Sequence, residues 1–231
     1  MLIDALNGQL SMLECLISII SALVVIFLTL PIHEFAHGFI STKLGDPTPR
    51  WQGRLTLNPM AHIDWLGALG ILLFGIGWAK PVQVNARYYK NPKWGMAIVA
   101  LAGPLSNIIV AFVSIFILNL VTLLFGFINL PMIVYDLVDL FLWTIAQINV
   151  YLAVFNLIPI PPFDGSRILF VFLPQKYYFK IMQYERFIFL GVLVLLYTGI
   201  LDAPLRLISN FVMYVLATVA SLPFSLLGVL M

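Results

Sequence analysis

An apolar run at residues 11–43 carries the ionisable motif His33-Glu34-Phe35-Ala36-His37 in its second half. The run is long enough to cross a bilayer, which takes about 20 predominantly apolar residues of helix. Ionisable side chains inside a membrane are costly, and they therefore mark functional sites by default. The run predicts a membrane helix that carries chemistry.

The composition of the chain extends this prediction. Of 231 residues, 62% are hydrophobic and only 10% are charged, whereas an ordinary soluble domain has about 25% charged residues. Such a chain cannot cover itself with polar surface, so we expect a single all-α multi-pass membrane domain over residues 1–231. The net charge of +2 and the lack of a basic stripe interleaved with aromatic residues argue against a nucleic-acid partner.

Further apolar segments predict the other membrane elements. The second segment is short and rich in glycine, and the segments in order are 63–78, 94–127, 137–158, 187–201 and 207–230. We expect a catalytic core at about 11–167 and accessory helices at about 186–231. Pro31 interrupts the first helix just before the motif, where its ring clashes with the carbonyl of Phe27 and kinks the helix.

Positive charge predicts the topology, because cytoplasmic loops carry an excess of Lys and Arg. If the glycine-rich second segment dips into the membrane and returns, 11 of the 12 Lys and Arg residues face one side, and Arg206 is the exception. We therefore expect about five transmembrane helices in the cell membrane and a re-entrant β-like element at about 63–85. The N-terminus is then outside, and the active site lies near the cytoplasmic side. Non-helical backbone at this depth needs the cover of protein or a water-filled cavity.

The motif itself predicts a metal centre. His33 and His37 share one helix face because they are four residues apart, and they can offer two imidazole nitrogens to one ion. Glu34 lies about 100° around the helix from His33, near the metal but off its axis, as a general base requires. His-Glu-x-x-His is a zinc-hydrolase signature, so we expect one Zn²⁺ per chain. Histidine and carboxylate sets also suit other divalent ions.

A catalytic zinc usually takes three protein ligands and leaves one position open. The best candidate for the third ligand is Asp164, which follows the proline-rich turn 159–162 and precedes Gly165. His62 and Asp64 are its rivals, because both follow the first helix closely. His62 fits a supporting or interfacial position better than a ligand position, and Asp64 fits an ordinary loop acid.

Two asparagines lie in otherwise apolar segments. Asn107 belongs to the third segment, and Asn156 stands one turn before the prolines. Each can hold a substrate carbonyl or orient a metal ligand. Each can equally serve as polar glue between helices, because membrane polar groups tend to bond across helices. Both interpretations remain open at this point.

Taken in order, these motifs resemble the site-2 protease family of intramembrane zinc metalloproteases. The resemblance covers about residues 31–167. It rests on the following motifs: His33–His37; Asn58-Pro59 with His62 and Asp64; Gly77-Trp78-Ala79-Lys80-Pro81-Val82; Gly103-Pro104 with Asn107; and Asn156, Pro159, Pro161 and Asp164-Gly165. The chain looks most like the compact branch without PDZ and CBS domains, for which it has no room. It departs from many members at Ser166, where they have a second glycine.

The resemblance implies roles for these residues. His33, His37 and Asp164 would bind zinc, Glu34 would activate water, and Asn107 and Asn156 would bind the substrate or the developing oxyanion. Family substrates are single-span membrane proteins, often already trimmed by another protease, and the released fragment is typically a cytoplasmic regulator. We therefore expect an intramembrane zinc endopeptidase.

The segment 80–85 alternates as a short strand, and its exposed edge could pair with an unwound substrate by β-augmentation. Two other functions remain as alternatives. A membrane metal-ion transporter or sensor would place polar groups at several depths along a path. A catalytically silent scaffold would have no need of Glu34 together with an intact ligand set.

Overall fold

The computed structural model describes residues 12–74, 77–125 and 131–226. The N-terminal residues 1–11 and the first part of the uncharged connection expected at 127–136 lie outside this range. Within it the chain is mostly helical, and the one β-contact is an isolated antiparallel bridge between Ile63 and Ala79.

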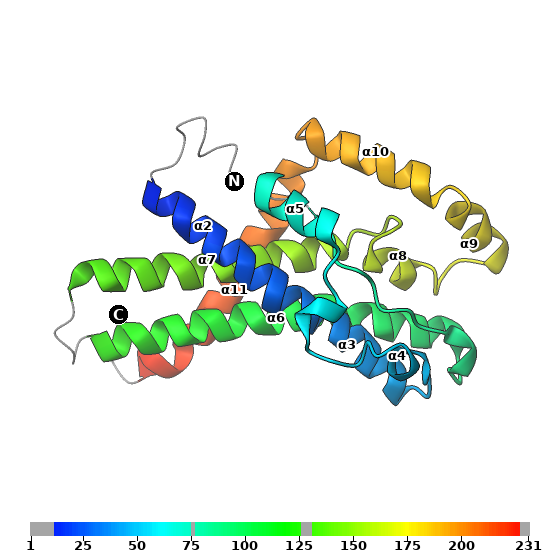
Figure 1. The fold of residues 1–231 in the computed structure, drawn as a ribbon, viewed down its shortest axis with the longest axis horizontal. Helices are drawn as coiled ribbons and strands as arrows, with labels where there is room; N and C mark the ends of the chain where they lie inside the picture. The colour runs from blue at the N-terminus through cyan, green and yellow to red at the C-terminus, as the bar shows by residue number, and fades with distance from the viewer. Residues whose placement is uncertain (1–11, 75–76, 126–130, 227–231) are drawn as a thin grey trace.

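Four helices of the described residues are long and apolar enough to cross a membrane (Figure 1). The first combines α2 (Met12–Val24), the π-helical turn η1 (Val25–Thr29) and α3 (Leu30–Lys43). The others are α6 (Pro92–Phe125), α7 (Met132–Asn156) and α11 (Asp202–Leu226). Figure 1 shows α6 and α7 side by side, with α2 and α3 crossing on one side and α11 on the other. A membrane protein is therefore the class that the fold supports.

Shorter elements connect these spans. They are α4 (Thr48–Trp51), η2 (Pro59–Ala61), α5 (Trp65–Phe74), η3 (Ala86–Tyr88), α8 (Asp164–Leu169), α9 (Gln175–Met182) and α10 (Glu185–Tyr197). The core of the bundle lies between α6, α7 and α11, where Ala111, Ala146 and Ala220 are fully buried. Small residues at these positions let the helix backbones approach closely, as membrane helices require.

The helix adapts to Pro31 through η1 rather than through a simple break. Pro31 has no N–H to donate to Phe27, and within η1 the Leu30 N–H donates to the Val25 carbonyl, five residues back. A π-helical turn shifts the register of the backbone bonds, and such turns are frequent at functional sites. The turn stands directly before the His-Glu-x-x-His motif on α3.

The expected fifth span is not confirmed. Its segment forms α10, which has 13 residues and ends before Gly199, a residue with φ of 73°. Thirteen helical residues rise about 20 Å, less than the roughly 30 Å of a hydrocarbon core. α10 therefore leads back to the start of α11 without qualifying as a span.

The glycine-rich second segment doubles back on itself. It forms α5, and then Ala79 returns to pair with Ile63, with the Lys80 N–H donating to the His62 carbonyl at 2.7 Å. A Cβ atom on Gly67 or Gly77 would overlap backbone atoms of the opposite arm, so close approach requires glycine at both positions. The expected strand at 80–85 is not confirmed, since these residues belong to no strand in the described part of the chain.

Contacts fix which ends of the spans lie together. His33 and His37 on α3 contact the first half of α6, whereas Phe125 at the end of α6 contacts Tyr135 near the start of α7. α11 runs parallel to α6, because Phe224 near its end packs on Phe116 with ring centroids 5.3 Å apart. The first turns of α11, with Arg206, therefore lie at the same end of the bundle as the His-Glu-x-x-His motif.

Candidate active site

Helix α3 brings His33 and His37 together. The two residues are four apart on one face, and their Nε2 atoms are 3.1 Å from each other. Both side chains are buried. Two imidazole lone pairs at this distance repel each other unless a cation or a proton lies between them. The geometry therefore suits a shared metal ion.

Asp164 lies beside this pair although it is far from both histidines in the sequence. α7 ends at Asn156, a proline-rich turn follows, and Asp164 is the first residue of α8. Its Oδ2 atom lies 3.4 Å from His33 Nε2 and 3.2 Å from His37 Nε2. Gly165 permits the turn, because a Cβ there would overlap the Leu157 carbonyl. Within the described residues, these three side chains form the one cluster able to hold a metal, with ligand atoms within 4.8 Å of one another.

The charge on Asp164 is favoured by its neighbours. Burial of the carboxyl group opposes ionisation, but the adjacent His37 and His33 outweigh it and hold the pKa of Asp164 well below its usual value. A carboxylate must be deprotonated to bind a metal. Asp164 therefore has the ionisation state that a ligand requires.

Backbone and side-chain acceptors orient both imidazoles. His37 Nδ1 donates to the Val99 carbonyl at 2.7 Å, and His33 Nδ1 donates to Asn107 Oδ1 at 3.3 Å. With Nδ1 donating in both rings, each Nε2 atom faces Asp164 and is the atom available to a metal ion. Metal-binding histidines in proteins are held in this way by a second hydrogen bond.

Gly103 on α6 leaves room for this arrangement. A Cβ at Gly103 would overlap His37 Nε2 and would lie 2.5 Å from His33 Nε2. The helix thus passes directly over the two nitrogens with only hydrogen atoms facing them. The donor set and the space beside it fit a zinc ion, which prefers nitrogen and oxygen ligands in tetrahedral geometry.

Glu34 lies beside the cluster but is not part of it. Its side chain is 9% exposed, and its Oε2 atom accepts a hydrogen bond of 2.8 Å from the Val82 N–H. Glu34 lines the same cavity as His33, His37 and Asp164. A carboxylate that faces the cavity without joining the ligand set has the position of a general base.

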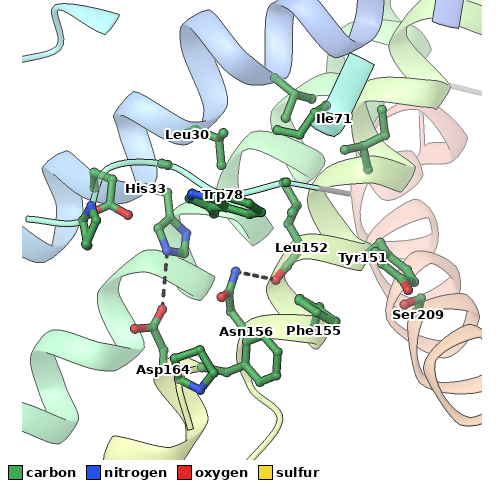
Figure 2. Close-up of a pocket in the computed structure, with 18 of the residues that line it drawn as sticks. Leu30, His33, Ile71, Trp78, Tyr151, Leu152, Phe155, Asn156, Asp164 and Ser209 are labelled. Atoms are coloured by element: carbon green, nitrogen blue, oxygen red, sulfur yellow. Dashed lines mark hydrogen bonds and ion pairs between the residues drawn. The ribbon is translucent and has the colours of Figure 1, made fainter. Parts of the chain in front are cut away.

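The cavity is large and mostly apolar, with a volume of about 1080 Å³. Figure 2 shows His33 and Asp164 at one side, with Trp78, Asn156 and Phe155 around them. Its far wall comes from α10 and α11, where Ser209, Asn210 and Met213 contribute. The cavity therefore connects the cluster to the membrane-spanning part of the bundle.

The two asparagines have different surroundings. Asn107 is fully buried, does not line the cavity, and contacts His33, which favours the ligand-orienting alternative over substrate binding. Asn156 lines the cavity, and its Nδ2 donates to the Leu152 carbonyl at 2.9 Å (Figure 2). An amide nitrogen has two hydrogens, so Asn156 retains one for a ligand.

The rivals of Asp164 stand apart from the cluster. His62 is buried, and its Nε2 donates to the Thr56 carbonyl at 2.8 Å. Asp64 Oδ1 accepts from the N–H groups of Leu66 and Gly67, and thereby caps the start of α5. Each residue holds the connection between α3 and α5, and neither belongs to the cluster.

Some site residues were not found by sequence reasoning. Trp78 had no role of its own within the Gly77–Val82 motif, but it is half-exposed and lines the cavity. The Val82 N–H bonds Glu34 through the backbone, so the identity of the Val82 side chain gives no signal for this role. On α11, the cavity is lined by Arg206, Asn210, Met213 and Ala217. Their spacing of three or four residues is the helical signal that places them on one face.

Two imidazoles, a carboxylate and an adjacent glutamate form the side-chain set of a zinc metallopeptidase. Comparison with known proteins agrees, since the model of "Peptidase family M50" matches residues 21–198. The chain belongs to peptidase family M50, the site-2 protease family, as its motifs suggested. It is accordingly a zinc-dependent metallopeptidase of the membrane.

Relatives support this membership. The chain is 40% identical to "Putative zinc metalloprotease YwhC" of Bacillus subtilis, over 76% of this chain and 79% of the relative. It is 30% identical to "Putative zinc metalloprotease Rip2" of Mycolicibacterium smegmatis, over 76% and 66%. It is 28% identical to "Zinc metalloprotease MJ0392" of Methanocaldococcus jannaschii, over 67% and 34%. No solved structure matches the chain significantly.

Proposed function

We propose that this metallopeptidase is an intramembrane endopeptidase that cuts peptide bonds within transmembrane segments of other membrane proteins. The observation that carries the proposal is the cavity of about 1080 Å³, which joins the His33–His37–Asp164 cluster to walls from the spanning helices. Its lining is mainly apolar, so an apolar substrate segment that leaves the lipid for the cavity still has apolar contacts.

His33, His37 and Asp164 hold the zinc ion in this proposal. Zinc, when bound, lowers the pKa of water to about 7 and polarises carbonyl groups. Asn107 and Val99 keep the two imidazole Nε2 atoms aimed at the metal. Gly103 keeps the space beside them open.

The remaining residues act on the substrate and its protons. Glu34 takes a proton from the attacking water and returns it to the leaving amine, and the Val82 N–H holds its carboxylate toward the cavity. Asn156 contacts the substrate carbonyl from the α7 side. His62 supports the site through the loop that it fixes.

The substrates in this proposal are single-span membrane proteins. A membrane helix satisfies its own backbone hydrogen bonds, so its peptide bonds are hidden until it is locally unwound. The cavity offers a protected place for the unwound segment. Release of a cytoplasmic regulatory fragment then follows from the position of the cut.

The site lies on the cytoplasmic side of the cell membrane in this proposal. With four spans, Arg206 joins the other Lys and Arg residues at the end of the bundle that holds the site, and all 12 face one side. The five-span prediction left Arg206 as an exception. The four-span arrangement therefore agrees better with the positive-inside rule, and both ends of the described chain lie outside.

Metal content tests the ligand set. We expect about one zinc per chain in the detergent-purified protein by mass spectrometry, and loss of zinc in Asp164→Ala. Asp136→Ala, an exposed acid at the opposite end of the bundle, is the matched control and keeps its zinc. Zinc retained by Asp164→Ala would move the third ligand elsewhere.

The position of the cut tests the intramembrane function. We expect mass spectrometry of the products from single-span reporters in proteoliposomes to find the new termini inside the apolar segment. Cuts only in the soluble flanks would reject intramembrane cleavage while leaving a metallopeptidase. Full zinc loading with no cleavage of any reporter would instead favour the silent scaffold.

A further inference from the structure

Asp46 is a fully buried carboxylate that the mechanism above does not use. It follows α3, after Gly45, whose φ of 104° lets the chain turn back toward the helix end. Its carboxylate receives three hydrogen bonds: Oδ2 accepts from Ser41 Oγ at 2.7 Å and from the Asn85 N–H at 2.7 Å, and Oδ1 accepts from the Thr48 N–H at 2.9 Å. A buried charge is tolerated only when hydrogen bonds or an opposite charge compensate for the loss of water.

The surroundings favour the charged form of Asp46. Burial opposes ionisation, but hydrogen bonds from Thr48, Asn85 and Ser41 more than offset it and hold the pKa of Asp46 below its usual value. Tyr89, itself buried, extends the network by donating to Ser41 Oγ at 2.7 Å. The network thus joins the end of α3 to the chain that leads into α6.

The important partner of Asp46 is the backbone of Asn85. The segment 82–85 returns from α5 along α3, and it is attached to the α3 side at two points. Val82 N–H donates to Glu34 Oε2 at one end, and Asn85 N–H donates to Asp46 Oδ2 at the other. Between them, Gln83 is exposed and Val84 lines the cavity.

These two attachments are mechanically coupled. Even when fully extended, three residues span at most about 10 Å, so the attachments at Val82 and Asn85 cannot move apart independently. The segment forms no strand that could hold it in place. The chain is held before Val82 by the Lys80 N–H bond to the His62 carbonyl, and after Val82 by the Asn85 N–H bond to Asp46. The position of the Val82 N–H, and with it the Glu34 carboxylate, therefore depends on both attachments.

We propose that Asp46 is a positioning residue for the peptidase reaction: it fixes the segment 82–85 so that the Val82 N–H holds Glu34 toward the cavity. This inference rests on the proposed role of Glu34 as the general base. Misplacement of a catalytic group by about 1 Å can cost a hundredfold in rate. Loss of the anchor should therefore lower the rate without removing the metal.

Amide hydrogen exchange tests the anchor without reference to activity. In Asp46→Ala, we expect the amides of Asn85 and Val82 to exchange at least tenfold faster than in the wild type, with no change in the core of α6 and α7. Asp46→Asn should give an intermediate rate, because its amide oxygen can still accept from Asn85. Thr42→Val is the matched control: the Thr42 hydroxyl donates to the Gly38 carbonyl of its own helix and takes no part in the Asp46 network, so exchange at Val82 stays at the wild-type rate.

Measurement of kcat, KM and zinc content separates a positioning role of Asp46 from a general loss of structure. We expect kcat on a single-span reporter to fall about 10- to 100-fold in Asp46→Ala, with KM within about threefold and one zinc per chain. Asp46→Asn should recover part of kcat. If Asp46→Ala does not fold, Asp46→Asn decides, with Val82 exchange several-fold faster and kcat several-fold lower than wild type.

Several outcomes would overturn the inference. If the Val82 amide exchanges at the wild-type rate in the Asp46 variants, Asp46 does not anchor the segment. If exchange is accelerated equally throughout α6 and α7, the role of Asp46 is general stability. Loss of kcat together with zinc would overturn the inference as well. If the wild type itself cleaves no reporter, the proposed function fails, while the exchange arm still decides whether Asp46 anchors the segment.

Discussion

At the scale of single residues, Gly103 faces the two histidine nitrogens more closely than any side chain could. We expect Gly103→Ala to lose most of its zinc, because the new Cβ would occupy the space beside His33 Nε2 and His37 Nε2. Zinc per chain by mass spectrometry measures this. Gly191→Ala on α10, where a Cβ meets nothing within 4 Å, is the control and should keep its zinc. Full zinc occupancy in Gly103→Ala would show that the ion binds elsewhere.

Asn107 carries a second residue-scale prediction. If its Oδ1 orients His33, then Asn107→Ala should weaken zinc binding about 10- to 100-fold, as loss of such a partner does in other metal sites. Competition with a chelator of known affinity measures the change. Asn119→Ala, on the same helix further from the site, is the matched control. Unchanged zinc affinity together with a raised KM would favour the substrate-binding role instead.

Sequence reasoning reached the residues whose spacing is itself the signal. His33, Glu34 and His37 follow from one helical turn, and Asp164 follows from the prolines and glycine around it. Val99 and Gly103 could not be assigned, because their contribution is a backbone carbonyl and an absent side chain. Such roles depend on how α6 crosses α3, which the pattern of residues does not encode.

At the scale of elements, the segment 80–85 returns beside Glu34 but forms no strand. Its expected pairing edge is partly taken, since the N–H groups of Val82 and Asn85 bond to Glu34 and Asp46. A proline at Val82 would therefore disturb Glu34 directly. Val84 is the better position for testing whether the segment pairs with the substrate backbone.

We expect Val84→Pro to abolish cleavage while zinc is retained, because proline removes the N–H that would pair with the substrate. Val84→Ala keeps the backbone donor and is the matched control, with most activity preserved. Cleavage of single-span reporters and zinc content are measured on the same preparations. Normal cleavage by Val84→Pro would exclude β-augmentation through this residue.

The terminal helices were the least predictable elements. The segment 187–201 is apolar enough for a span, but it offers only about 15 residues, and α10 is shorter still. Length was therefore the better criterion than hydropathy. The cavity-facing side of α11 was also missed, because single polar residues on an apolar helix stand out only when their helical spacing is considered.

At the scale of the whole molecule, the four-span arrangement makes a prediction that the five-span arrangement does not. In a Cys15→Ser background, Ala203→Cys at the start of α11 should react with a membrane-impermeant maleimide from the same side as Gln52→Cys. Met132→Cys, at the start of α7, should react only from the opposite side. Labelling in intact and in lysed cells measures this, and labelling of Ala203→Cys together with Met132→Cys would restore the fifth span.

The central claim is that Glu34 and a zinc held by His33, His37 and Asp164 cleave peptide bonds in the membrane. The most direct measurement compares wild type and Glu34→Gln for zinc content and for cleavage of a single-span reporter in proteoliposomes. We predict one zinc per chain in both proteins, and cleavage by Glu34→Gln that is about 10²- to 10⁴-fold slower, the range expected for loss of a general base. Equal cleavage rates by the two zinc-loaded proteins would contradict the account.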